Sequence, residues 1–354
     1  MLKRMTALLL AVMILAGIAL LSGCGTAENP TTGSTGTSTP TTTGTTGTTG
    51  TTGTTTATQP STAPTGTTAG TQPSSTPTGT TVVTQPSTVP TQATKPSQPS
   101  GSDDEMIGEL YTRSELMALN NDTRGYGPGP CNPNNNNRAE YAVGEQNRFG
   151  QYGANFIAPD NGKIYLTFDC GYEYTTKLNG KDIRVTEWIL DTLKEKNVKA
   201  VFFVTMYYCK QSPDLVQRMV DEGHAVGNHS NNHPDMTTIS IDKAVYEVMS
   251  LHEYVEENFG YKMTLFRPPT GNFSARSLAI VQSLGYKNVH WSFAYTDWLT
   301  DKQPDVTSAL NTVTSKAHSG AIYLLHAVSV TNATILGDAI DAFIDKGFNL
   351  ELFQ

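Results

Sequence analysis

Two acids, three histidines, an arginine and a thiol carry most of the chemistry available to this sequence after residue 160. In chain order they are Asp169, Cys170, His229, His233, Arg267, Asp297 and His326. Carboxylates and imidazoles act as general bases and acids, and neutral imidazoles also bind metal ions. If the fold gathers them, these residue types predict an acid–base site, a metal site or both.

Taken singly, the same residues have structural explanations. Asp169 could cap the segment after it, Arg267 could anchor a loop, and His326 could be a core histidine. His229 and His233 could be a surface pair. Two histidines four residues apart in a loop can, however, bind one metal ion. The joint arrangement, more than any member, favours a site.

Short apolar runs alternate with helical periodicity after residue 160. Strands are expected near 163–168, 200–204, 225–228, 263–266, 288–292, 321–325 and 348–353. Helices are expected near 213–220, 241–259, 274–285, 306–317 and 333–346. Such alternation predicts an α/β fold with a parallel sheet, and six or more units favour a barrel.

The candidate residues all follow predicted strands. Asp169 and Cys170 follow the first strand, the histidine pair the third, Arg267 the fourth, Asp297 the fifth and His326 the sixth. Because chemistry in such folds gathers at the C-terminal ends of the strands, we expect these side chains on one face of the barrel.

The charge of the chain argues against nucleic acid as a partner. The only charged residues before position 102 are Lys3, Arg4, Glu28 and Lys95, so the remainder holds 31 acids and 21 bases, a net charge of −10. An acidic domain without a run of Lys or Arg binds nucleic acid poorly.

The N-terminus resembles an export signal. Lys3 and Arg4 precede an apolar run over 8–21, which is shorter than a membrane span. The run ends in Leu21-Ser22-Gly23-Cys24-Gly25, which resembles the cleavage box of bacterial lipoproteins. This predicts a signal peptide over 1–23 and a lipid on Cys24. The chain would be anchored on the outer face of the cell membrane, facing the wall. An ordinary signal peptide or an uncleaved anchor are the alternatives.

Residues 24–101 have the composition of a disordered tether. They are mostly Thr, Gly, Pro, Ser, Gln and Ala, and Thr-Gln-Pro-Ser recurs from positions 58, 71 and 84. This segment has too little apolar surface to offset the entropy lost on folding. As a flexible coil it would span about 50 Å. The part that can fold is therefore about 250 residues, enough for one domain.

Five ordered motifs resemble those of the NodB-type polysaccharide deacetylases, carbohydrate esterase family 4. They are Thr167-Phe168-Asp169-Cys170-Gly171, His229-Ser230-Asn231-Asn232-His233-Pro234, Arg267-Pro268-Pro269-Thr270-Gly271, Trp291 with Asp297-Trp298, and Leu324-Leu325-His326. The resemblance extends over about 163–353. It implies a distorted (β/α) barrel over 161–354 and a hydrolase that acts on the carbon–nitrogen bonds of linear amides.

A narrower resemblance concerns the substrate. Gly171-Tyr172-Glu173, Gly223-His224 with Gly227-Asn228-His229-Ser230, and Trp291-Ser292-Phe293-Ala294 are similar to the branch of the family that acts on N-acetylmuramic acid in peptidoglycan. It implies peptidoglycan glycan strands as the partner of this domain. A deacetylase of N-acetylglucosamine strands, chitin-like chains or xylan is one alternative. A catalytically silent carbohydrate-binding wall protein is the other.

The family resemblance also implies roles for the site residues. Asp169 would be the general base, oriented by Arg267, and His326 the general acid, kept protonated by Asp297. Tyr172 would offer a backbone N–H to the oxyanion. Substrate binding would involve Tyr172, Trp298, Pro269 and Gly271.

The resemblance implies a divalent metal, with zinc favoured, on His229 and His233. The family's third ligand is an Asp, and Cys170 takes that position here. Cys170 could be a thiolate ligand, a bystander, or half of a disulfide with Cys209, which leaves Cys131 unpaired.

Residues 102–160 carry no motif, and we expect this extension to pack on the barrel near the groove.

Overall fold

The computed structural model describes residues 104–354. The predicted signal peptide (1–23), the predicted lipidation site Cys24 and the predicted tether (24–101) all lie outside the described residues. None of the helices within 104–354 is both long and apolar enough to cross a membrane.

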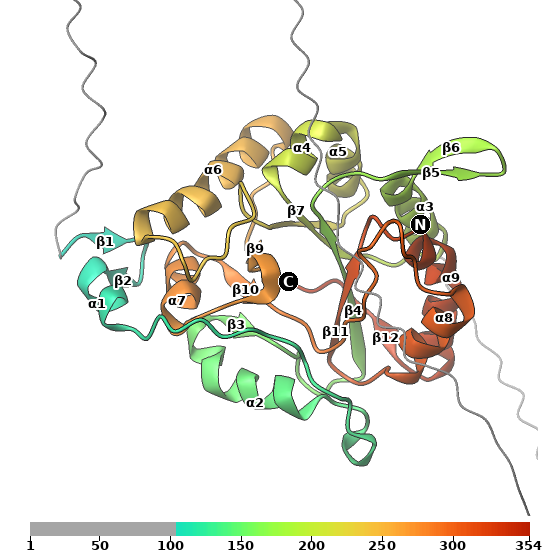
Figure 1. Cartoon of the computed structure of the whole chain (residues 1–354), viewed down its shortest axis with the longest axis horizontal. Coiled ribbons are helices and arrows are strands. Elements are labelled where there is room, and N and C mark those ends of the chain that lie inside the picture. The colour runs from blue at the N-terminus through green and yellow to red at the C-terminus, as the bar shows by residue number, and fades with distance from the viewer. Residues whose placement is uncertain (1–103) are drawn as a thin grey trace, which may run out of the picture. The chain divides into compact units, whose positions relative to one another are not determined.

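A parallel sheet surrounded by helices forms the core of the described part (Figure 1). Its neighbouring strands run in the order β11, β4, β7, β8, β9, β10, β3, and β12 pairs with β4. Their bounds are β3 Ala154–Asn155, β4 Lys163–Cys170, β7 Val201–Val204, β8 Ala225–Asn228, β9 Leu265–Phe266, β10 Lys287–Val289, β11 Ala321–His326 and β12 Asn349–Leu350.

The two ends of this strand order approach each other and nearly close the sheet. After β10, Phe293 forms a single parallel bridge with Tyr323 of β11. The Ser292 amide donates to the Ile322 carbonyl at 2.9 Å, and the Leu324 amide donates to the Phe293 carbonyl at 2.9 Å. A barrel joined by so short a ladder on one side is distorted, which confirms the predicted fold class.

Helices cover the outside of the sheet. They are α1 Arg113–Ala118, α2 Glu140–Phe149, α3 Val185–Glu195, α4 Met206–Gln211, α5 Pro213–Asp221, α6 Ile241–Phe259, α7 Ala275–Ser283, α8 Val306–Ser315 and α9 Val330–Asp345. The longest, α6, begins after Ser240, whose side chain accepts from the Lys243 amide, and ends at Gly260 in a left-handed conformation. These are strong start and stop signals for a helix.

Two short antiparallel hairpins lie outside the barrel sheet. One joins β1 (Met106–Ile107) to β2 (Tyr111–Thr112), and the other joins β5 (Thr175–Leu178) to β6 (Lys181–Arg184). The second hairpin projects from the body of the domain next to α3 (Figure 1). It follows Tyr172 along the chain and therefore begins close to the predicted site.

Alternating side chains along the strands divide the core in two. In β4, Ile164, Leu166 and Phe168 pack under the helices, whereas Tyr165 belongs to a separate cluster inside the barrel. This alternation is a property of every strand. It decides which residues at the strand ends can reach the site.

The N-terminal extension contributes a strand that the sequence did not indicate. Its β3 pairs in parallel with β10, and Ala154 and Phe156 belong to a third apolar cluster together with Phe273 and Leu278. The described part of the extension, residues 104–160, therefore supplies part of the sheet as well as covering it.

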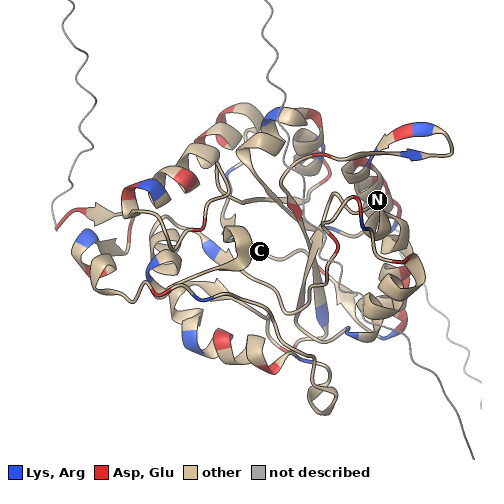
Figure 2. Cartoon of the chain, in the orientation of Figure 1, with Lys and Arg blue, Asp and Glu red and all other residues tan. Residues whose placement is uncertain are grey.

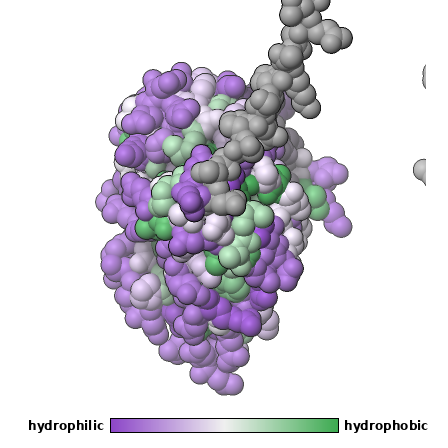
Figure 3. All heavy atoms as spheres, turned by 90° about the vertical axis from the view of Figure 1, so that its left-hand side faces the viewer, coloured by the Kyte–Doolittle hydropathy of each residue, from purple (hydrophilic) through white to green (hydrophobic). Residues whose placement is uncertain are grey.

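Residues of both charges lie along the helices (Figure 2), and the face seen in Figure 3 is predominantly polar. Acidic and basic residues alternate along the outer helices (Figure 2). On the side seen in Figure 3, hydrophobic spheres form small patches among hydrophilic ones. The mixture of acidic and basic residues along the helices agrees with the absence of a Lys/Arg run in the sequence.

Candidate functional site

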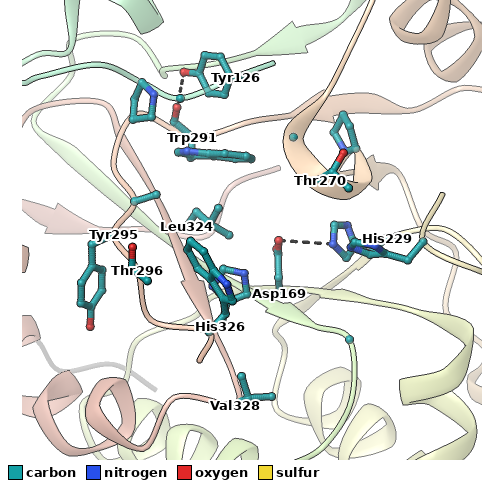
Figure 4. Close-up of a pocket in the computed structure, with 18 of the residues that line it drawn as sticks. Tyr126, Asp169, His229, Thr270, Trp291, Tyr295, Thr296, Leu324, His326 and Val328 are labelled. Carbon is teal, nitrogen blue, oxygen red and sulfur yellow. Dashed lines mark hydrogen bonds and ion pairs between the residues drawn. The ribbon is translucent and has the colours of Figure 1, made fainter. Parts of the chain in front are cut away.

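A pocket of about 700 Å³ opens at the C-terminal ends of the barrel strands. The predicted residues that line it are Asp169, Tyr172, His229, His233, Gly271, Trp298 and His326. They come from the ends of β4, β8 and β11 and from the loops that follow β4, β8, β9 and β10. Figure 4 shows Asp169, His229 and His326 pointing into the same space.

Asp169 is held by a fully buried arginine. Its Oδ1 accepts from Arg267 Nη1 at 2.8 Å. The guanidinium also donates to the carbonyls of Val289 and His290, each at 3.1 Å, and lies over the Phe203 ring. Burial, the largest single effect, would raise the pKa of Asp169, but the charge and hydrogen bond of Arg267 together with the charges of His229 and His326 outweigh burial and lower it. The carboxylate therefore stays ionised at neutral pH.

The histidine pair lies beside this carboxylate. His229 Nδ1 is 2.9 Å from the Arg267 carbonyl, which can only accept, so Nδ1 carries the proton. The lone pair is then on Nε2, which lies 3.6 Å from Asp169 Oδ2 (Figure 4). Burial lowers the pKa of His229 to about 4 and also lowers that of His233, so both rings are neutral at pH 7.

A buried glutamate holds the loop that carries the two histidines. Ser230 and His233 both have positive φ, 66° and 57°. The amide and side-chain nitrogens of Asn232 donate to the Glu247 carboxylate at 2.7 and 2.9 Å. Glu247 belongs to α6, is inaccessible to solvent and was not predicted. Its place on the apolar face of the helix, three residues after Ala244 and four before Leu251, was the available signal.

His326 is paired with a second buried carboxylate. His326 Nδ1 lies 2.6 Å from Asp297 Oδ1, and the His326 amide donates to Asp297 Oδ2 at 2.8 Å. Asn332 Nδ2 also donates to Oδ2, at 2.6 Å. Burial, the largest single effect, would lower the pKa of His326, but the hydrogen bond and charge of Asp297 together with the charge of Asp169 outweigh burial and raise that pKa. Asn332, from the first turn of α9, was not predicted.

Cys170 does not join the histidines. It packs in the apolar core under the helices with Phe168 and Cys209, and burial raises the pKa of its thiol. Because β4 extends through Cys170, the side chains of Asp169 and Cys170 point to opposite faces of the strand. The prediction of Cys170 as a ligand is therefore corrected. Cys131, Cys170 and Cys209 are free thiols, so the Cys170–Cys209 disulfide is not formed either.

The predicted substrate-binding residues separate into three groups. Tyr172 and Trp298 line the pocket with half-exposed rings. Gly271 also lines it with φ of +75°, and a Cβ there would lie 2.6 Å from the Trp291 ring, so only glycine fits. Pro269 is buried and does not line the pocket, whereas Pro268 and Thr270 do.

The extension contributes a wall that the sequence did not indicate. Tyr126, Gly127 and Pro128 line the pocket, and the Tyr126 hydroxyl donates to the Trp291 carbonyl at 2.6 Å. Nothing in the local sequence around Tyr126 marks it as part of a site more than 40 residues further along the chain.

Comparisons with known proteins agree with this geometry. The profile of a family described as polysaccharide deacetylase matches residues 157–289. Peptidoglycan-N-acetylmuramic acid deacetylase PdaA of Bacillus subtilis is 43% identical over 191 residues, 53% of this chain and 68% of that protein. Peptidoglycan-N-acetylglucosamine deacetylase PgdA of Listeria monocytogenes is 34% identical over 191 residues, 54% of this chain and 38% of that protein.

Similarity extends to a solved structure. The structure of Bacillus subtilis PdaA, described as a family 4 carbohydrate esterase, matches with a TM-score of 0.59 and 36% identity, covering 66% of this chain and 96% of that one. The matched family profile includes Asp169, both histidines and Arg267, whereas Tyr126 lies before its first residue.

Proposed function

This chain belongs to the polysaccharide deacetylase family, a family of hydrolases that act on amide bonds, and we propose that it removes N-acetyl groups from the amino sugars of peptidoglycan. One observation carries the proposal. An ionised carboxylate, Asp169, and an imidazole with a raised pKa, His326, face the same pocket. A base and an acid in one pocket are what amide hydrolysis requires.

The reaction can be followed atom by atom. Asp169 accepts a proton from water as the water oxygen bonds to the acetyl carbon. His326 then donates its Nε2 proton to the sugar nitrogen while the carbon–nitrogen bond breaks, leaving acetic acid and a free amine, and return of the Asp169 proton to His326 restores both groups. Arg267 keeps Asp169 ionised and fixed, and Asp297 holds the imidazole by Nδ1 so that Nε2 faces the substrate.

The histidine pair fits a divalent cation, for which we propose zinc. Both rings are neutral, and the Nε2 lone pair of His229 is free because Nδ1 donates to a carbonyl. Among residues 104–354 no group of three His, Cys, Asp or Glu side chains is arranged around a metal, so His229 and His233 would hold the ion and leave other positions open. Such an ion would polarise the acetyl carbonyl and acidify bound water.

N-acetylmuramic acid is the preferred residue in this proposal. The named muramic acid deacetylase of Bacillus subtilis is 43% identical over 68% of its length, and the named N-acetylglucosamine deacetylase of Listeria is 34% identical over 38%. N-acetylglucosamine strands are the second candidate. A purely carbohydrate-binding role is disfavoured because binding needs neither the Arg267–Asp169 pair nor the Asp297–His326 pair.

We also propose that the enzyme is exported and held at the outer face of the membrane by a lipid on Cys24. The support is the sequence of residues 1–25. An anchored enzyme of this kind would act on the wall of its own cell.

Acetate release from purified peptide-free peptidoglycan strands tests the activity. We expect release by the wild type and a loss of at least about 100-fold in Asp169→Asn, because the variant removes the base. Oligomers composed of N-acetylglucosamine alone, compared with strands that contain both sugars, separate the two candidate substrates. No release from either polymer would overturn the proposal. A chelator that abolishes release would support the metal.

A further inference from the structure

The segment 121–128 crosses the two loops that carry the site. Asn121 Nδ2 donates to the Thr237 carbonyl at 2.9 Å, and the hydroxyls of Thr123 and Thr237 are 2.6 Å apart. Thr237 follows the histidine pair in the chain. Further along, Arg124 and Phe273 exchange backbone hydrogen bonds of 2.8 and 3.0 Å, and Phe273 follows the Arg267 motif. The 121–128 segment thus joins both loops.

Tyr126, two residues after Arg124 in the same segment, reaches a third element. Tyr126 donates its hydroxyl proton to the Trp291 carbonyl, and the two rings meet edge to face with centroids 5.2 Å apart. The ring also contacts Phe156 and His290, at centroid distances of 4.9 and 5.1 Å. Tyr126 is therefore fixed on several sides, and it fixes the backbone of Trp291.

Trp291 forms the wall of the pocket that faces Leu324 and the Asp169–His326 region (Figure 4). Its ring leaves no room for a side chain at Gly271. A displacement of Trp291 would consequently change the width of the pocket between the loop that contains Gly271 and strand β11. The polar atom of Tyr126 is occupied by the Trp291 carbonyl, so the surface that Tyr126 and Pro128 add to this wall is mainly apolar.

We propose that the 121–128 segment is a specificity-determining wall of the substrate groove, with Tyr126 setting the position of Trp291 and Gly127 the width beside it. The proposal rests on the proposed function. It assigns to the extension a part in choosing the glycan, in contact with the apolar faces of a pyranose ring and its substituents. The family profile, which begins at residue 157, does not contain this wall.

Two substitutions in the full-length protein alter the wall in opposite ways. Tyr126→Phe keeps the ring and removes the bond to Trp291, which is worth about 0.5–1.5 kcal/mol, a factor of about 2 to 13. Gly127→Leu adds bulk at a position that lines the pocket, and the backbone accepts it because a Cβ there meets no atom within 4 Å and φ is not in the left-handed region. We expect each to raise KM for muramic acid strands about two- to tenfold with kcat changed less than twofold.

The selectivity of the variants distinguishes a groove wall from a purely structural segment. Relative to muramic acid strands, N-acetylglucosamine oligomers should gain in kcat/KM in Tyr126→Phe, because the wall is looser, and both polymers should lose in Gly127→Leu. A structural role alone would lower the melting temperature and leave the KM values and their ratio unchanged.

Tyr141→Phe is the matched control. The Tyr141 ring stacks on Tyr126 at 6.1 Å, is 42% exposed and does not line the pocket. It should match the wild type. If wild type releases acetate and both wall variants keep its KM values, the inference is wrong and the proposed function stands. A wild type that releases none from either polymer removes the proposed function and the inference with it.

Discussion

Two buried carboxylates at the site, Asp169 in the pocket and Asp297 behind His326, have different roles because different partners hold them. Asp169 faces the guanidinium of Arg267, which lowers its pKa. The carboxylate is therefore ionised before the reaction and free to accept a proton from water. Asp297 instead accepts hydrogen bonds from the backbone amide and the Nδ1 of His326 and from the side chain of Asn332. Its charge therefore stabilises the imidazolium form of His326. One residue type thus supports a base and an acid within one pocket.

The second pair predicts a pH dependence. A general acid is lost as the pH rises through its pKa, and Asp297 raises the pKa of His326. The other charged groups near the ring are Asp169, which also raises that pKa, and Arg267, which lowers it. Asp297→Asn removes the largest attractive contribution, so the alkaline limb of kcat/KM should move to lower pH. At pH 8 we expect a loss on the order of 10- to 100-fold.

Asp301→Asn provides the comparison, since Asp301 is an exposed acid in the same loop and does not line the pocket. Its pH–rate profile should coincide with that of the wild type. An alkaline limb that stays in place in Asp297→Asn would mean that His326 is not the group whose proton is needed.

Sequence alone located the site residues that lie at a strand end or in the loop after it, because the apolar run of a strand largely sets where that strand ends. Asn332 escaped because its contact with Asp297 depends on how α9 enters after β11. Tyr126 escaped because its contact spans 165 residues of chain. Neither contact leaves a local pattern.

At the scale of elements, α6 does more than cover the sheet. Its Glu247 accepts two hydrogen bonds from Asn232, and Lys243, one turn earlier, lies 2.8 Å from the same carboxylate. The loop between β8 and α6 contains two residues with positive φ, a conformation that non-glycine side chains disfavour. The helix therefore holds a strained loop in the shape that brings His233 beside His229.

Glu247→Ala should therefore weaken metal binding without touching a ligand. Loss of a group that orients ligands typically costs 10- to 100-fold in metal affinity, and we expect this range for Zn²⁺ titrated into metal-free protein by calorimetry. Unsatisfied donors on Asn232 should also lower the free energy of unfolding by about 1–3 kcal/mol. Glu257→Ala, an exposed site on the same helix, should change neither quantity. Equal zinc affinity in Glu247→Ala and wild type would contradict the role given to α6.

The elements themselves were largely predictable, with failures that have local causes. The predicted helix at 241–259 coincides with α6 because its apolar residues step by three or four and Ser240 and Gly260 flank it. The strand β3 has two residues, too few for an alternating pattern. The expectation for Cys170 came from its place at the family's third ligand position, and the first strand was expected to end at Phe168. Two more residues of strand place neighbouring side chains on opposite faces.

At the scale of the whole molecule, the acidic domain and its substrate must meet without help from a positive surface. Acidic and basic residues are interspersed on the helices, and the sequence after residue 101 has a net charge of −10. Attachment beside the wall would raise the local concentration of glycan chains without any new contact, as tethering does for linked binding modules. The proposed lipid on Cys24 therefore matters for the reaction in the cell and not for the chemistry in the pocket.

The proposed lipid anchor predicts that a mutation of Cys24 removes the enzyme from the membrane without changing its catalytic activity. In a bacterial host given labelled fatty acid, wild type should carry label and sediment with membranes, whereas Cys24→Ala should carry none, because the acylated thiol is absent. Cys131→Ala, which removes a half-buried free thiol, should keep the label. Detergent-extracted wild type and Cys24→Ala should release acetate from isolated strands at rates within twofold, since the pocket lies wholly in 104–354.

Cys24→Ala that stays in the membrane without label would instead identify residues 8–21 as an uncleaved anchor. Label retained by Cys24→Ala would exclude the lipoprotein assignment.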